Sequence, residues 1–278
     1  DDFEHFGLAI SPDIDTVIYT LAERANDTQG WGRADEHWTV MQELERLGGE
    51  QWFRIGDRDI ALHLLRTQFL RAGKDLTQTT SEIAKRLGIA HPILPMSNQP
   101  VRTIVHTDRG DLPFQHYFVR ERCVPQAHGF SFDGAHVAQL SVEVSRALDD
   151  DGLRGVIVCP SNPYVSIAPM LAVPGMRERL CALRAPIVAI SPIIGGRALK
   201  GPAAKMMAEA GSEVSALTVA RLYADFIDAM ILDAEDAALA AQAAKDDPQL
   251  ICAATVMRTR EERIALAQIC LRLLDRLP

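Results

Sequence analysis

The sequence predicts an α/β fold, with a Rossmann-like parallel-sheet core covered by helices and a mainly helical insertion. In the second half of the chain, short apolar runs of strand length alternate with helical segments. This alternation is typical of a parallel sheet covered on both faces. Residues 11–88, in contrast, show only helical spacing. The 278 residues, 47% of them hydrophobic, suffice to bury one large core or two smaller ones.

Helix start and stop signals organise the predicted insertion. The stretch "SPDIDTVIYTLAER" begins with a serine cap, a proline at the first helical position and acidic residues in the first turn. Three further helical stretches follow, "ADEHWTVMQELERLGG", "DRDIALHLLRTQFLRAG" and "LTQTTSEIAKRLG", and each ends at glycine. We therefore assign residues 11–91 to a helical insertion, and residues 1–10 and 92–278 to the α/β core.

The core begins with a predicted hairpin, in which "VRTIVHT" and "FQHYFVRER" are strands joined by the turn "DRGDLP". Beyond it, strands are predicted over residues 156–159, 187–190, 229–232 and 251–254. Helices are predicted over residues 138–148, 174–182, 203–210, 219–226, 235–244 and 260–277. This order places successive strands in one parallel sheet.

Charge and cysteine usage exclude several classes of function. The net charge of −8 and the pI near 5.5 argue against binding to nucleic acid or to an anionic membrane. No apolar run reaches the roughly 18 residues of a membrane span, and no signal peptide is recognisable. The five cysteines form no CxxC pair, which favours a reducing compartment, the cytoplasm. The motifs HExxH, GxSxG and GxGxxG are absent.

Two strand-to-helix connections predict a phosphate site. In an open parallel sheet the ligand binds beyond the carboxyl ends of the strands, where "PSNP" and "SPIIGGRALKG" are expected to lie. Small residues let phosphate oxygens approach backbone N–H groups, and lysine adds positive charge. The candidate residues are Ser161, Asn162, Ser191, Gly195, Gly196, Lys200 and Lys205. The alternative is that both are ordinary turns, which favour the same residue types.

Acidic residues near the N-terminus predict a magnesium site. Asp1 and Asp2 precede Asp13 and Asp15 of "SPDIDT", and Mg²⁺ binds one or two carboxylates together with phosphate and water oxygens. The alternative is that acids in a first helical turn interact with the helix dipole.

Three further residues are candidate contacts to an anionic or flat ligand. Arg54 and Arg58 of "FRIGDRD" could bind a phosphate or an anionic ring system, or could instead serve in capping and salt bridges. Trp31, flanked by glycines in "GWGRADEHW", is placed where a flat ligand could stack.

Several motifs in order resemble one known family. These are "DDF", "ISPDIDTVIYTLA", "GWGRADEHW", "GDRDIALHLLRTQFLRAG", "ILPMSNQPV", "FQHYFVRER", "PSNPYVSIAPMLAVPGMRE" and "SPIIGGRALKGPAAKMM". Together they are similar to the 2-phospho-L-lactate transferase family, CofD and its actinobacterial counterpart FbiA. The resemblance runs from the first residue to beyond Asp233.

The resemblance implies a transferase in the biosynthesis of the deazaflavin coenzyme F(420). Such enzymes take a guanosine diphosphate derivative of a three-carbon acid and transfer its phosphoacyl part to a hydroxyl of the deazaflavin precursor Fo, releasing GMP. The family pattern implies Mg²⁺ bound by Asp1 and Asp13, with Asp15 and Arg54 contacting Fo. We add the hypothesis that Asp15 or a neighbouring residue helps to deprotonate the attacking hydroxyl. A cytoplasmic homodimer is also expected.

The sequence departs from the family pattern in one respect, and it leaves two alternative functions open. Family members usually carry a strand and a "GGTGG"-like loop before the "DD" motif, and we expect a complete enzyme to have them. The main alternative is a nucleotide-sugar-binding regulator of the related gluconeogenesis-factor type, which usually lacks the "PSNP" and "GDRD" motifs. A nucleotide-binding domain without catalysis is the third. The transferred acid, whether phospholactate, phosphoenolpyruvate or phosphoglycerate, cannot be read from these residues.

Overall fold

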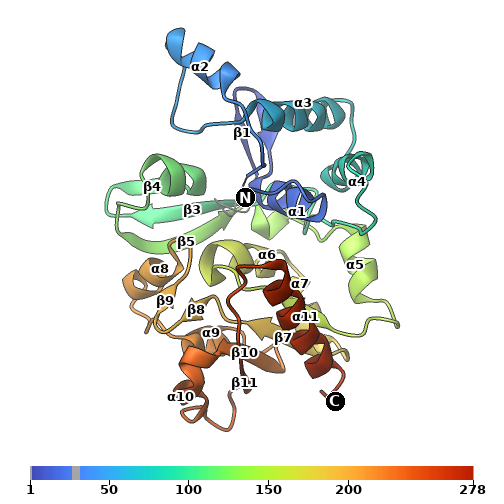
Figure 1. The fold of residues 1–278 in the computed structure, drawn as a ribbon, viewed down its shortest axis with the longest axis vertical. Coiled ribbons are helices and arrows are strands. Elements are labelled where there is room, and N and C mark those ends of the chain that lie inside the picture. Colours follow the sequence, from blue (N-terminus) through green and yellow to red (C-terminus); the bar gives the residue numbers. More distant parts are fainter. Residues whose placement is uncertain (1, 27–31, 278) are drawn as a thin grey trace. The chain divides into compact units, whose positions relative to one another are not determined.

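The computed structural model describes residues 2–26 and 32–277, and the chain forms two compact units (Figure 1). The first comprises Asp1–Pro125 and Ser131–Ser145, and the second Gln126–Phe130 and Arg146–Pro278. Residues 92–125 thus group with the helical segment, whereas the sequence-based division grouped them with the parallel-sheet core. Both units contribute to the predicted α/β fold class, which is confirmed.

The first unit contains the four helices expected from the helix signals. They are α1 (Pro12–Leu21), α2 (Thr39–Arg46), α3 (Asp57–Arg71) and α4 (Leu76–Arg86). Pro12 starts α1, as predicted, but the Ser11 side chain forms no capping hydrogen bond. In α4, Asp75 and Gln78 form a capping box that satisfies two backbone N–H groups. A short antiparallel hairpin, β1 (Phe3–His5) with β2 (Leu8–Ile10), precedes α1.

Apolar packing holds α1 against α3 and α4. Ile18 and Tyr19 of α1 are almost fully buried and cluster with Leu62 of α3 and Ile83 of α4. Burying side chains of this size contributes about 1.5 to 3 kcal/mol each. Helices α1 and α3 also carry buried polar residues, which face the cavity described below.

The predicted hairpin exists, but its second strand is not where the sequence analysis placed it. Strand β3 (Arg102–Thr107) pairs with β4 (Gly110–Pro113), so the return strand lies within the predicted turn "DRGDLP". The stretch predicted as a strand, "FQHYFVRER", is instead helical and includes the π-helical turn η1 (His116–Arg120). The third strand of the sheet is β5 (Ala127–Asp133), giving the order β4-β3-β5. Glycine at 110, with φ of +101°, permits the tight return of the chain.

The second unit contains the predicted parallel sheet. Its four strands are β6 (Val156–Val158), β7 (Ile187–Ile190), β10 (Ala229–Asp233) and β11 (Gln249–Ala253), in the order β11-β10-β7-β6. Every residue of β7 and β10 is buried, as expected for central strands covered on both faces. Neighbours in the sheet are consecutive along the chain apart from the short β8 and β9.

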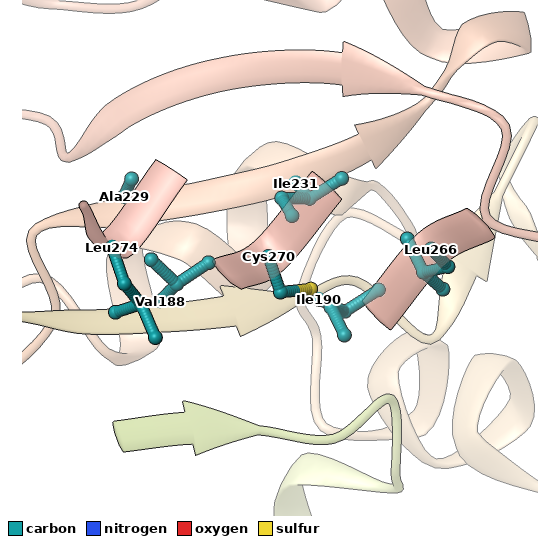
Figure 2. Close-up of a cluster of buried hydrophobic side chains, with 7 residues drawn as sticks. All are labelled: Val188, Ile190, Ala229, Ile231, Leu266, Cys270 and Leu274. Carbon is teal, nitrogen blue, oxygen red and sulfur yellow. The ribbon is translucent and has the colours of Figure 1, made fainter. Parts of the chain in front are cut away.

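A C-terminal helix, α11 (Arg260–Leu274), covers one face of this sheet. Figure 2 shows Leu266, Cys270 and Leu274, spaced four residues apart, directed toward side chains of β7 and β10. The partners are Val188, Ile190, Ala229 and Ile231. Thr259 and Glu262 form a capping box that starts the helix at the predicted position.

The remaining elements connect the strands. In the first unit they are η2 (Ala135–Val137) and α5 (Val142–Leu148), which crosses the unit boundary. In the second they are η3 (Pro163–Ile167), α6 (Ala168–Leu171), α7 (Met176–Ala182), β8 (Ile193–Ile194), β9 (Arg197–Ala198), α8 (Ala203–Glu209), α9 (Ala216–Leu222), η4 (Ala234–Asp236) and α10 (Ala237–Ala240). The helix predicted over residues 235–244 is therefore only η4 and the single turn α10.

Candidate active site

A cavity of about 950 Å³ lies within the first unit. Its walls come from α1, α3, the segment before α2, the segment before α3, and the helical segment that follows β4. The carboxylates lining it are Asp13, Asp15, Asp35, Glu36 and Asp59, and the guanidinium groups are those of Arg33, Arg54 and Arg122. Its aromatic lining is Tyr19, Trp38, Trp52, Phe53, Phe114 and Phe118. The cavity thus combines flat apolar walls with groups of both charges.

Asp15 of α1 is bound to a buried arginine of α3. Nη1 of Arg66 donates to Oδ2 of Asp15 at 3.1 Å, and Nη2 donates to Oδ1 in a short contact. The Arg66 side chain is 1% exposed, and Nη1 also lies 3.1 Å from Nδ1 of His63. A bidentate pair between a guanidinium and a carboxylate is the geometry in which both charges are best satisfied. Both Asp15 oxygens are therefore engaged inside the protein.

Burial shifts the pKa values of this cluster. Burial raises the pKa of Asp15 to about 6, and the Arg66 guanidinium opposes that rise. Burial lowers the pKa of His63 to about 3, and the charge of Arg66 lowers it further. His63 is therefore neutral at physiological pH. The charged groups of the cluster are therefore Arg66 and Asp15, which pair with each other.

A second polar link between α1 and α3 joins Tyr19 to Asp59. The Tyr19 hydroxyl donates to Oδ1 of Asp59 at 2.5 Å. Burial raises the pKa of the Tyr19 hydroxyl far above its ordinary value, and the Asp59 charge adds to the rise. Burial also raises the pKa of Asp59. Both residues line the cavity.

The aromatic side of the cavity carries an arginine. The Arg54 guanidinium lies 4.6 Å from the centre of the Trp38 ring, a cation–π contact. Phe114 and Phe118 stack nearly parallel, 5.5 Å between ring centres and 6° between planes. Phe118 is 39% exposed, a large fraction for an aromatic side chain that lines a cavity. Such flat surfaces suit the face of a ring system.

Reciprocal capping explains two of the sequence motifs. Asp57, the first residue of α3, accepts hydrogen bonds from the backbone N–H groups of Thr39 and Val40 at the start of α2. Glu36, which precedes α2, accepts one from the backbone of Arg58 at the start of α3. These hydrogen bonds hold the "ADEHW" and "GDRD" motifs, and so the starts of α2 and α3, against each other. The Arg58 side chain is exposed and is not part of the cavity lining, unlike that of Arg54.

Of the predicted metal ligands, only Asp13 falls within the described residues. Its side chain is exposed in the first turn of α1 and lines the cavity. Asp1 and the predicted stacking residue Trp31 lie outside the described residues. Among residues 2–26 and 32–277, no group of three or more potential ligands is placed to hold a metal ion.

In the second unit, Ser161 and Asn162 follow β6 as predicted. Asn162 caps η3: its Oδ1 accepts from the backbone N–H of Tyr164 at 2.9 Å, and its Nδ2 lies 3.2 Å from the Met206 sulfur. Ser161 is partly exposed. These contacts give Asn162 a role in building the turn, while its assignment to a nucleotide stays a prediction.

The "SPIIGG" stretch forms a tight β-hairpin, β8 with β9. Gly195 and Gly196 have φ of +55° and +71°, the left-handed conformations that a two-residue hairpin turn requires. The Gly195 N–H donates to both oxygens of Asp236 at 3.1 Å. Ser191 is 2% exposed, and its hydroxyl bonds to the backbone of Ile193. Lys200 is exposed beyond the hairpin.

These contacts give the hairpin residues a structural explanation, so their assignment to the diphosphate stays a prediction. Lys205, the other predicted phosphate contact, pairs with Glu209 at 2.6 Å.

Sequence reasoning missed four residues of the cavity cluster: Tyr19, Asp59, His63 and Arg66. The signal was present, because residues 59, 63 and 66 are spaced by four and three and so share one face of α3. Three titratable residues on one face of a helix are a signal of a polar cluster on that face. The aromatic pair of Phe114 and Phe118 was missed because its segment was taken as a strand.

A comparison with protein families assigns the chain as a whole. Residues 1–268 match the family described as "2-phospho-L-lactate transferase CofD". The chain belongs to the CofD family. It is therefore a transferase of the CofD type, acting in coenzyme F(420) biosynthesis.

Similar CofD relatives carry two names. A phosphoenolpyruvate transferase from Kitasatospora aureofaciens is 42% identical over 242 residues, which cover 85% of this chain and 75% of the relative. A 2-phospho-L-lactate transferase from Methanosarcina mazei is 37% identical over 232 residues, covering 84% and 75%. One from Methanosarcina acetivorans is 36% identical over 276 residues, covering 97% and 86%. Within the described residues, no helix has the length and apolar character to cross a membrane.

Proposed function

We propose that the chain transfers a phospho-three-carbon-acid group from its guanosine diphosphate derivative to a hydroxyl of Fo and releases GMP. The hydroxyl oxygen forms a bond to phosphorus, the bond from that phosphorus to the GMP oxygen breaks, and the hydroxyl proton leaves to a base or water. The observation that carries the proposal is the cavity of the first unit, together with membership in the CofD family. The protein's task in such a reaction is positioning and charge stabilisation.

The cavity has the chemistry that Fo requires. Fo combines a flat ring system with a hydroxylated side chain. The stacked Phe114 and Phe118 and the Arg54–Trp38 pair offer flat surfaces for the ring. Carboxylates on α1 and α3 offer acceptors for hydroxyl groups. A volume of about 950 Å³ is at the upper end of the usual range for small-molecule sites.

Asp13 fits a magnesium ligand better than Asp15 does. Mg²⁺ keeps several water or phosphate ligands and takes one or two carboxylates from the protein. The Asp13 carboxylate is exposed at the cavity surface, whereas both oxygens of Asp15 are bonded to Arg66. Bound there, the ion would neutralise negative charge on the phosphate groups of the donor. We propose Asp1 as the second carboxylate, from the family resemblance alone.

The donor side of the proposal rests on the second unit. The segments after β6 and β7 leave the carboxyl edge of a parallel sheet, where ligands of such folds bind. Ser161 and Lys200 have exposed or partly exposed side chains there and are our candidates for contact with the diphosphate. Gly195 donates its N–H to Asp236, so an incoming phosphate must displace that carboxylate to use it.

The decisive experiment is a transfer assay with three donors. Fo is incubated with Mg²⁺ and the guanosine diphosphate derivative of phospholactate, phosphoenolpyruvate or phosphoglycerate, and the products are separated by mass. One donor should yield the phosphoacyl derivative of Fo together with an equal amount of GMP. The relatives bear the names of two different acids, so similarity does not choose between them. Absence of product with all three donors contradicts the proposal.

A binding measurement separates the proposal from its alternative. Fo, and GMP with Mg²⁺, should each raise the melting temperature, because a ligand that binds only the folded state stabilises it. A shift with a UDP-sugar and none with Fo would favour the nucleotide-sugar-binding regulator instead. Light scattering of the same samples tests the expected homodimer.

A further inference from the structure

Asp15 and Asp59 line the same cavity from neighbouring helices, but the protein compensates their charges differently. Asp15 is bonded through both oxygens to Arg66. Asp59 forms no ion pair with any described residue. Its hydrogen-bond donors are the Tyr19 hydroxyl, 2.5 Å from Oδ1, and the backbone N–H of Gly56. Asp59 is thus a partly exposed carboxylate whose negative charge is not neutralised by direct contact.

The partner of Asp59 leaves the carboxylate as an acceptor. Tyr19 is 2% exposed, and its hydroxyl stays protonated because burial raises its pKa far above the ordinary value. The hydroxyl therefore donates to Asp59 and does not accept from it. A carboxylate has about four lone-pair positions, so two protein donors leave room for hydrogen bonds from a ligand.

The other charges of the cavity indicate what kind of donor can approach. Arg33, Arg54 and Arg122 line the same cavity, and none of them forms an ion pair within the described part of the chain. Arg33 lies over the Tyr19 ring at 6.0 Å. The charge of Arg33 acts on Asp59 and opposes the rise in its pKa, so this carboxylate already faces a cation and a neutral donor suits its remaining lone-pair positions. Hydroxyl groups on adjacent carbons fit, as when an acidic residue binds the ribose of a dinucleotide.

We propose that Asp59 is a specificity-determining residue that binds hydroxyl groups of the acceptor's polyol side chain, with Tyr19 holding its carboxylate in position. This inference rests on the proposed function, because it assigns a part of the acceptor to one residue. The ring of the acceptor contacts the aromatic surfaces instead, and those include Trp38 and Phe118. Recognition of the chain and recognition of the ring are therefore separable.

A pair of ligands tests this separation. Fo and the same deazaflavin ring carrying a methyl group in place of the polyol chain are titrated against wild type and D59N, with binding followed by ligand fluorescence. Asp59→Asn should weaken Fo about tenfold or more, since a hydrogen bond to a charged group is lost. Binding of the chain-free ring should change less than about twofold. Glu45→Gln, an exposed carboxylate change on α2, is the control and should affect neither ligand.

The outcomes distinguish this inference from the function on which it rests. Equal losses for both ligands, or no loss for Fo, overturn the role of Asp59 in binding the chain. Wild type that binds neither ligand overturns both proposals, whereas wild type that binds Fo without transferring any group overturns only the proposed reaction. Tyr19→Phe, which removes the positioning hydroxyl, should give a smaller loss with the same preference between ligands. If D59N is unfolded at the assay temperature, Tyr19→Phe replaces it in the test.

Discussion

Arg66 of α3 holds both carboxylate oxygens of Asp15 of α1, and the two side chains are 1% and 7% exposed. Nδ1 of His63 lies 3.1 Å from Nη1 of Arg66, so the imidazole belongs to the same buried cluster. A buried pair is costly to break, because the remaining charge stays out of water without its partner.

Replacing Arg66 should therefore destabilise the protein strongly. Arg66→Met leaves the buried Asp15 without its guanidinium, and we expect the free energy of unfolding to fall by about 3 to 5 kcal/mol. Denaturant unfolding measures it. The control is Arg46→Met, which removes an exposed pair with Glu43 and should cost less than about 1 kcal/mol. Equal costs for the two variants would show that the buried pair is not important for stability.

The dependence of stability on pH should reveal His63. Its pKa is about 3 in the folded protein and 6.5 ordinarily, so the unfolded chain binds the proton more tightly. The stabilisation from keeping His63 neutral is complete above pH 6.5 and is lost as the pH falls toward 3. A fully developed difference of one proton changes stability by about 1.4 kcal/mol per pH unit.

The measurement compares wild type with His63→Gln, so that the opposite effect of Asp15 cancels. The pKa of Asp15 is raised to about 6, and alone it would make the protein less stable as the pH rises from 4 to 6. Between pH 5 and 7, the melting temperature of wild type should rise relative to that of H63Q. A constant difference across this range would mean that His63 titrates normally in the folded protein.

Asp13→Asn tests the proposed magnesium ligand. The side chain is exposed, so the melting temperature should stay unchanged, while turnover at ordinary Mg²⁺ should fall by more than about tenfold. Raising the Mg²⁺ concentration should recover part of the activity. Glu43→Gln, another exposed carboxylate change, serves as the control. Near wild-type turnover in D13N would remove Asp13 from the metal site.

Gly195→Ala tests the hairpin turn. A methyl group at this position would lie 2.2 Å from Oε1 of Glu235, which is itself held by Arg197, and φ is +55°. We expect a loss of about 1 to 2 kcal/mol in stability, mostly from the left-handed conformation, because the exposed Glu235 side chain can move away from the added methyl group. At Gly175, also left-handed, a methyl group would have no described residue beyond its chain neighbours within 4 Å, and Gly175→Ala should cost about 1 kcal/mol. A smaller loss at Gly195 than at Gly175 contradicts this description of the turn.

Much of the fold could be predicted because local signals agreed with long-range packing. Helix α11 has a capping box at its start and apolar residues four apart, and strand β7 is a short run of apolar residues between turns. The "FQHYFVRER" stretch is predicted as a strand from its aromatic residues, but Phe114, Tyr117 and Phe118 are spaced as on one face of a helix, and the segment is helical. The hairpin ends earlier, at Pro113, which periodicity alone does not show.

The site was predicted less completely than the fold. Asp13, Asp15 and Arg54 were predicted as site residues and line one cavity, and their roles there stay predictions. Tyr19 and Arg66 were not predicted, because in a helical sequence an aromatic residue is usually core and an arginine is usually exposed. Only the tertiary contact between α1 and α3 shows that each is buried beside a carboxylate.

The two polar links between α1 and α3 also bear on how a ligand binds. Tyr19 with Asp59 and Arg66 with Asp15 join the helices, and both links are made between side chains of the protein itself. The cavity's carboxylates therefore need little further ordering when the acceptor arrives. The conformational entropy lost on binding falls mainly on the acceptor's own rotatable bonds, so a rigid analogue that fixes those bonds in the bound geometry should gain affinity without any new contact.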